Sequence, residues 1–142
     1  MMTNNPFAGN WAYRSLLNNP DLSADFDKLE FGRGTLAIAA ESDTLMGGTI
    51  GGPGWSLELR GSLAYGSPMQ ARFQGKGEVG GAPWIYDYVA WLVPAWPASA
   101  AGQQTDAMVG SVTRTIPHPD GNGGTSPAGV VASFYAVRQS VS

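Results

Sequence analysis

The sequence predicts an all-β protein, folded as a single antiparallel up-and-down β-barrel of about eight strands with one short helix after the first strand. Only 13% of the 142 residues are charged, about half the usual share, so too few Glu and Lys side chains are present to coat several surface helices. The 20 glycines and 10 prolines separate runs in which apolar and polar residues alternate with the period of a strand. A β-sandwich is the alternative arrangement of the same strands.

A barrel is favoured over a sandwich because closing a sheet removes its unprotected edges, and this weakly charged chain has few charged side chains to protect them. The runs follow one another through mostly short turns, with no crossover helix between them. A chain of 142 residues forms one domain, here residues 1–142. A barrel of about eight strands has an interior that side chains just fill or that holds one small ligand.

The first strand is expected over residues 9–16, where Trp11, Tyr13 and Ser15 share a face. Residues 1–8 are polar and rich in Asn, and they predict a loose N-terminal arm.

The helix is expected over residues 18–29, with Pro20 near its start and acidic residues in its first turn. Leu22, Phe26 and Leu29 follow at helical spacing and form one apolar stripe. Such a short helix would serve as a lid or plug of the barrel.

Seven further runs are predicted as strands. They span residues 31–40, 45–50, 55–63, 69–79, 84–96, 108–116 and 129–138. The runs 55–63 and 69–79 alternate strictly, with polar and charged residues on one side, which predicts an antiparallel pair with one solvated face. The run 84–96 has no plainly polar side.

Composition excludes several functional classes. The net charge is −3 and no basic run occurs, which argues against a nucleic-acid-binding surface. No apolar run has membrane-spanning length and no signal peptide is evident, so a soluble, unprocessed, cytoplasmic protein is expected, with no membrane span. The chain has no Cys and a single His, and no dinucleotide- or phosphate-binding motif. We therefore expect no metal and no other cofactor.

Aromatic residues are the most informative feature, with five Trp, five Tyr and five Phe. Several of them are crowded into the run 84–96. Rigid aromatic walls with a few hydroxyl or indole donors bind planar apolar ligands, so these residues are the candidate ligand-binding set. The set consists of Trp55, Phe73, Trp84, Tyr86, Tyr88, Trp91 and Trp96. An ordinary aromatic core with an aromatic subunit contact is the alternative, which leaves a homo-oligomer possible.

Two residues are candidates for acid or base catalysis. Asp87 is the only charged residue of its run, and burial would raise its pKa toward the range of a general acid or base. It faces away from Tyr86 and Tyr88, so either the tyrosines or Asp87 with Trp91 face the interior. His118 is the only histidine, and the prolines on both sides of it hold the backbone so that the ring could stand at the barrel mouth.

Gly9-Asn10-Trp11 at the start of the first strand resembles the Gly-x-Trp entry motif of the lipocalins, calycin barrels that carry small apolar ligands, and the avidins begin similarly. Tyr86-Asp87-Tyr88 resembles the second lipocalin motif, Thr-Asp-Tyr, with Tyr in place of Thr and the triplet within a strand. The resemblance implies a calycin-like barrel in which Arg138, or alternatively Arg114, packs across Trp11 as a structural cap. Allene oxide cyclase-like and spirocyclase-type barrels share the length and general strand pattern.

Three functions are consistent with these features. The leading one is a barrel that binds a hydrophobic or aromatic small molecule in an aromatic-lined cavity. The second is a cofactor-independent cyclase or isomerase that acts on an apolar substrate inside the barrel. The third is a protein-interaction domain with a solid core, whose contact surface includes Trp91 and Trp96.

Overall fold

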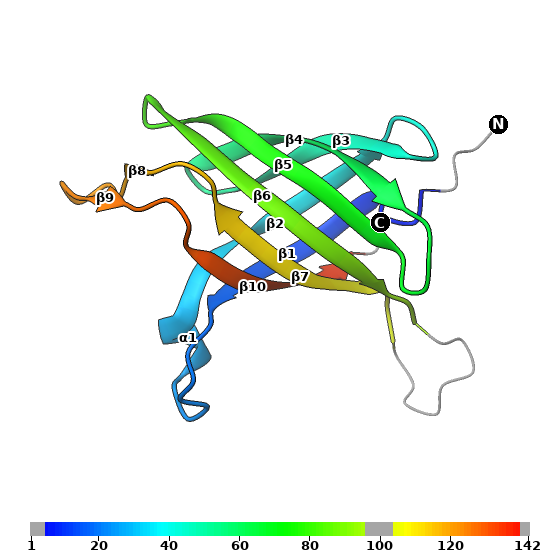
Figure 1. The fold of residues 1–142 in the computed structure, drawn as a ribbon, viewed down its shortest axis with the longest axis horizontal. Helices are drawn as coiled ribbons and strands as arrows, with labels where there is room; N and C mark the ends of the chain where they lie inside the picture. Colours follow the sequence, from blue (N-terminus) through cyan, green and yellow to red (C-terminus); the bar gives the residue numbers. More distant parts are fainter. Residues whose placement is uncertain (1–4, 96–103, 140–142) are drawn as a thin grey trace.

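Eight strands close into one antiparallel barrel in the computed structural model, which describes residues 5–95 and 104–139 (Figure 1). The strands are β1 (Gly9–Leu17), β2 (Glu30–Ala40), β3 (Leu45–Gly52), β4 (Trp55–Ala64), β5 (Gln70–Val79), β6 (Ala82–Val93), β7 (Ala107–Arg114) and β10 (Val131–Arg138). Their order around the barrel is β1-β10-β7-β6-β5-β4-β3-β2. The predicted all-β barrel is confirmed, and the sandwich is excluded.

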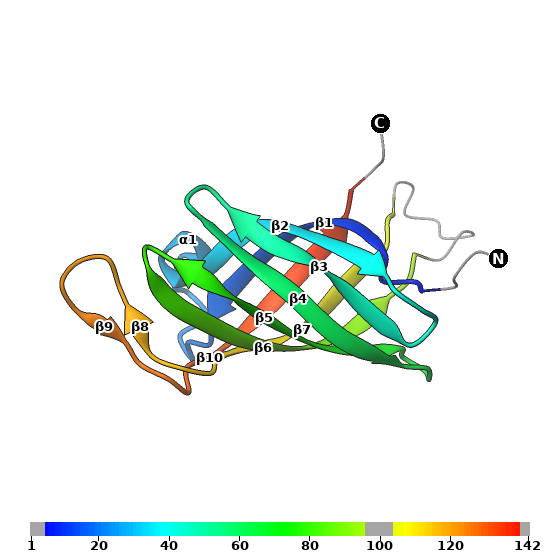
Figure 2. The same cartoon turned by 90° about the horizontal axis from the view of Figure 1, so that it is seen from above.

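The connection from β7 to β10 carries a small hairpin of its own. Its two strands, β8 (His118–Pro119) and β9 (Thr125–Ser126), pair only with each other. The hairpin projects from the same end of the barrel as the segment between β1 and β2 (Figures 1 and 2).

The helix between β1 and β2 is shorter than predicted. Only α1 (Phe26–Leu29) is helical, and Asp25 caps it by accepting a hydrogen bond from the amide of Asp27. Leu22 and Phe26 are 93% and 64% exposed, so the predicted apolar stripe does not enter the barrel as a plug. The apolar residues are spaced as in a helix, but no neighbouring surface covers them. Only a single helical turn therefore forms.

The strands have the alternating burial expected of a barrel with a packed interior. On β5, for example, Ala71 and Phe73 are buried while Arg72 and Gln74 are exposed. Gly48 is required where β2 and β3 approach closely, because its φ is +123° and an added Cβ would lie 1.9 Å from the carbonyl oxygen of Ala37.

The outer surface differs between the two sides of the barrel. On β4 and β5, charged residues face solvent, with Glu58 paired to Arg60 at 3.1 Å and opposite Lys76 in the strand register. On β6, β7 and β10, an apolar row of Trp91, Val109 and Tyr135 lies on the outside. This row explains why β6 lacks a polar side in the sequence.

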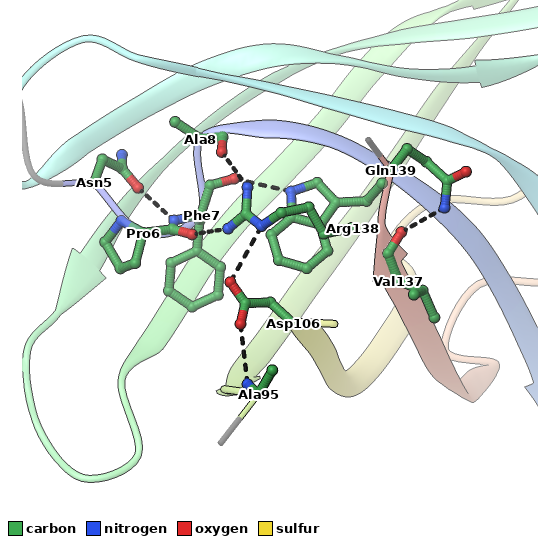
Figure 3. Close-up of polar contacts among 10 residues, drawn as sticks. Asn5, Pro6, Phe7, Ala8, Ala95, Asp106, Val137, Arg138 and Gln139 are labelled. Carbon is green, nitrogen blue, oxygen red and sulfur yellow. Dashed lines mark hydrogen bonds and ion pairs between the residues drawn. The ribbon is translucent and has the colours of Figure 1, made fainter. Parts of the chain in front are cut away.

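One end of the barrel is closed by the N-terminal segment (Figure 3). Phe7 and Trp11 are both 0% exposed, and the Trp11 indole donates to the carbonyl oxygen of Phe7 at 3.0 Å. The guanidinium of Arg138 lies 4.3 Å from the Trp11 ring centroid. Residues 5–8 therefore differ from the expected loose arm, because Phe7 supplies the apolar side chain that fills this end.

Arg138 also holds this end together through polar contacts. It donates to the carbonyl oxygen of Ala8 at 2.7 Å and to Asp106 at 3.2 Å, and a second oxygen of Asp106 accepts from the amide of Ala95 at 3.0 Å (Figure 3). In the described part of the chain, no helix is long and apolar enough to cross a membrane.

Candidate ligand cavity

The opposite end of the barrel contains a cavity of about 160 Å³. Side chains from β1, β2, β4, β6 and β7 surround it. Its lining consists of Tyr13, Ser15, Phe31, Gly32, Trp55, Leu57, Trp84, Tyr86, Tyr88 and Val112. Phe31, Trp55 and Trp84 are only partly buried, so they mark the side on which the cavity meets solvent.

Three tyrosines belong to the lining. Tyr86 and Tyr88 occupy successive inward positions of β6, and Tyr13 faces them from β1. The Tyr88 ring stacks on Phe73 with the centroids 4.9 Å apart, and Tyr13 meets it edge-on at 6.2 Å. These contacts fix the orientation of the rings before any ligand binds.

Burial keeps these phenols neutral. It raises the pKa of Tyr88 well above the ordinary value, because the charged phenolate would lose its hydration inside the barrel. Burial likewise raises the pKa of Tyr13, against a smaller opposing effect of a hydrogen bond with Ser15. At physiological pH both side chains are hydrogen-bond donors as well as acceptors.

At the mouth of the cavity, the β8–β9 hairpin places His118 against β6. The imidazole stacks on Trp84 with the ring centroids 4.0 Å apart, and its Nε2 lies 2.7 Å from the Tyr86 hydroxyl. Its Nδ1 lies 2.9 Å from the carbonyl oxygen of Pro119, which only accepts, so Nδ1 carries the proton. In the neutral ring Nε2 is then the acceptor, and the Tyr86 hydroxyl donates to it.

Arg114, at the end of β7, completes this cluster. Its Nε donates to the Tyr86 oxygen at 2.9 Å and its Nη1 to the carbonyl oxygen of Pro127 at 3.2 Å. The guanidinium also lies 4.9 Å from the Phe31 ring centroid. Within residues 5–95 and 104–139, no carboxylate forms an ion pair with Arg114.

The Tyr86 hydroxyl thus stands between a base and a cation. Burial raises the pKa of Tyr86, while the hydrogen bond and the charge of Arg114 act in the opposite direction. Because Tyr86 also lines the cavity, this cluster can exchange a proton with an occupant through one hydroxyl.

The structure brings part of the predicted ligand-binding set together. Trp55, Trp84, Tyr86 and Tyr88 line the cavity, whereas Phe73 packs behind Tyr88 in the core. Trp91 is 38% exposed on the outer surface of β6, because Tyr86 and Tyr88 take the inward positions. Trp96 lies outside the described residues.

Asp87, the other catalytic candidate, is on the outside of the barrel. Its carboxylate accepts hydrogen bonds from Gln74 at 3.0 Å and from the Thr115 hydroxyl at 2.9 Å. The strand alternation that brings the tyrosines inward separates Asp87 from the cavity, so an interior acid or base role does not fit its position. His118 is 6% exposed and reaches the cavity through Tyr86.

Sequence analysis missed six residues of the lining, which come from β1, β2, β4 and β7. These residues are Tyr13, Ser15, Phe31, Gly32, Leu57 and Val112. The shared face of Tyr13 and Ser15 was visible in the sequence, but its position opposite Gly32 depends on the β1–β2 register, which shifts just after Ser15. Arg114 could have been singled out from the sequence, because it is the only charged residue of its strand.

Across the described ranges, no group of three or more His, Cys, Asp or Glu side chains is arranged to hold a metal ion. The closed antiparallel barrel of eight strands is compatible with a calycin-like fold. Comparisons with protein-family models, with curated proteins and with solved structures found no match to this chain.

Proposed function

We propose that this protein binds a hydrophobic or aromatic small molecule in the cavity at the open end of the barrel. The open end is the one opposite the closed end, where Phe7 and Trp11 are buried. The observation that carries the proposal is the cavity of about 160 Å³ itself, since its lining is mostly aromatic and includes three tyrosines. Small-molecule sites combine apolar walls with a few placed polar groups in this way. A protein with a solid barrel would have no such space.

The binding energy would come mainly from the apolar walls. A ligand that enters between Phe31, Trp55 and Trp84 buries its own surface and that of partly exposed rings, at about 25 cal/mol per Å². Because Tyr88 and Tyr13 are already held by their aromatic neighbours, little conformational freedom is lost when the ligand binds.

Two Trp variants test this proposal as a matched pair. Trp55→Ala removes a wall of the cavity, and Trp91→Ala makes the same chemical change on the outer surface. Native mass spectrometry of protein purified from its host, followed by denaturing extraction, should release a recurring small molecule from the wild type and from Trp91→Ala, and much less from Trp55→Ala. The proposal would be contradicted if both variants lost the ligand equally. It would also be contradicted if no form released a ligand and none bound any member of a panel of aromatic and lipid compounds.

A second candidate, a cofactor-independent isomerase or cyclase, is favoured by the position of Tyr86 between His118 and Arg114. In such an enzyme His118 Nε2 would take the proton of the Tyr86 hydroxyl, and the Tyr86 phenolate beside Arg114 would remove the α proton of the substrate. Tyr86 would then return this proton to the γ carbon, and His118 would give its own proton back to Tyr86. Cyclohex-3-enone is a suitable probe, because moving one proton from the α to the γ carbon gives the conjugated enone, which absorbs in the ultraviolet.

Turnover of this probe should be lost in Tyr86→Phe and His118→Gln and kept in Asp87→Asn, whose side chain is outside the barrel. An unchanged rate in Tyr86→Phe would remove the enzyme candidate and leave the binding proposal standing.

The apolar row of Trp91, Val109 and Tyr135 on the outer surface fits the homo-oligomer that the sequence left open. Light scattering during gel filtration tests this: an oligomer that Trp91→Ala converts to a monomer would support it, and a monomeric wild type would refute it.

A cytoplasmic location stays a prediction of the sequence.

A further inference from the structure

We propose that the occupant of the cavity is a single-ring compound with a carbonyl oxygen, and that this oxygen accepts a hydrogen bond from the Tyr88 hydroxyl. This inference rests on the proposed binding function and specifies the chemical class of the ligand. It follows from the size of the cavity, from the absence of a hydrogen-bond partner for the Tyr88 hydroxyl among the described residues, and from the distribution of charge around the cavity.

The size of the cavity limits the occupant to about one ring. Its volume is about 160 Å³, and an apolar protein cavity of about 150 Å³ holds benzene. Drug-sized ligands need about 300 Å³ or more. A polycyclic ligand would therefore extend beyond the partly exposed rings of Phe31, Trp55 and Trp84 into solvent.

The Tyr88 hydroxyl lacks a hydrogen-bond partner among the described residues, although the side chain is only 4% exposed. The Tyr88 oxygen is not among the atoms that are both fully buried and without a partner, so it borders open space, and an acceptor supplied by the occupant can bond to it there. The ring leans from its place on β6 toward the open end, because its Cε1 lies beside Gly75, the register partner of Tyr86. The hydroxyl therefore points along the barrel toward the cavity and away from the closed end.

Tyr13 provides a second donor on the facing wall. Its ring also leans toward the open end, with Cε1 near Gly32, the register partner of Ser15. The Ser15 hydroxyl beside it donates to the carbonyl oxygen of Gly32 at 3.4 Å. A carbonyl oxygen has two lone pairs and can accept from both phenols.

The charge distribution favours a neutral carbonyl over a carboxylate. No residue of the lining carries a charge at neutral pH. The nearest cation, Arg114, stands at the mouth, where its Nε is bonded to Tyr86. A carboxylate placed at Tyr88 would lose its hydration without an ion pair, whereas a ketone or aldehyde oxygen needs only the neutral donors that are present.

A matched ligand pair tests the inference. Cyclohexanone and methylenecyclohexane have the same ring and nearly the same shape, and only the ketone accepts a hydrogen bond. Titration calorimetry on the wild type should show the ketone binding about threefold to tenfold more tightly than the alkene, the range of one neutral hydrogen bond. Tyr88→Phe should remove this difference by weakening the ketone alone. Tyr135→Phe, a tyrosine on the outer surface, should leave it unchanged.

Other outcomes separate the failure of this inference from the failure of the proposed function. If the two probes bind the wild type equally, or if the preference for the ketone survives in Tyr88→Phe, the hydrogen bond is refuted while ligand binding stands. If neither probe binds but larger apolar compounds do, the single-ring class is refuted. If nothing in the panel binds, the proposed function fails with it. The comparison of probes on the wild type decides the inference even if Tyr88→Phe does not fold.

Discussion

Each end of the barrel has an arginine against an aromatic ring, and the two arginines have different surroundings. At the closed end, Arg138 covers Trp11 and is bound by backbone carbonyl groups and by Asp106. At the open end, Arg114 lies over Phe31 and donates to Tyr86, a side chain of the cavity. The first arrangement leaves no room beside the indole, and the second leaves the cavity beside the phenol. An arginine against an aromatic ring thus belongs to the sealed end in one case and to the mouth of the cavity in the other.

The largest difference between the ends should appear when a tryptophan is removed from each. Trp11→Ala should lower the free energy of unfolding by about 3–5 kcal/mol, because the side chain is fully buried. Trp84→Ala should cost less than half as much, because Trp84 is partly exposed at the mouth. Urea denaturation measures both, and equal losses would show that the two ends are packed alike.

The alkaline stability of the protein should depend on the open end. Tyr13 and Tyr88 have folded-state pKa values above the ordinary 10.0 of a phenol, so above pH 10 the unfolded state releases protons that the folded state retains. The free energy of unfolding is therefore undiminished below pH 10 and should fall above it by about 1.4 kcal/mol per pH unit for each such group. Urea denaturation at pH 9 and pH 11 should show a smaller fall in Tyr88→Phe, and an identical fall would contradict the assignment.

Removal of the arginines should have a smaller effect, again unequal. Arg138→Met removes the hydrogen bonds of the guanidinium to Asp106 and to the carbonyl oxygen of Ala8, and it should cost about 2–3 kcal/mol of stability. Arg114→Met removes one hydrogen bond to Tyr86 and one to Pro127, and it should cost about 1 kcal/mol. Thermal and urea denaturation compare them, and a larger loss for Arg114→Met would reverse the roles assigned to the two ends.

The smallest effect should follow from His118→Phe. The new ring can still stack on Trp84, but it cannot accept from Tyr86, so the global stability should fall by only about 1 kcal/mol. Hydrogen exchange should become faster in the β8–β9 hairpin and stay unchanged at the closed end. Unchanged exchange in the hairpin would mean that the Tyr86 contact does not hold it to the barrel.

The fold could be predicted from local patterns, because strand alternation and turn residues act over short distances. The run 69–79, for example, corresponds to β5 (Gln70–Val79). The helix was overestimated, since the spacing of Leu22 and Phe26 does not reveal that no surface covers them. The inward side of β6 was left undecided because outward-facing residues of this strand, such as Trp91 and Val93, are apolar as well, so polarity did not distinguish its two sides.

The cavity could be predicted only in part. Trp84, Tyr86 and Tyr88 were candidates because they are close in sequence, and they meet at one end because they alternate on one strand. Phe31 and Val112 come from other strands, and only the strand register brings them to the same level. The role of His118 depends on a hairpin whose position against Trp84 has no local signal in the sequence.

The most direct test of the central claim, that one end of the barrel is packed and the other holds a ligand, is a titration of the ¹⁵N-labelled protein with cyclohexanone, followed at the assigned indole signals. The indoles of Trp55 and Trp84 line the cavity, and that of Trp11 is bonded to Phe7 at the closed end. We predict saturable shifts of the Trp55 and Trp84 signals while the Trp11 signal stays in place. Equal shifts at all three, or no shift at Trp55 and Trp84 with any single-ring probe, would contradict the account.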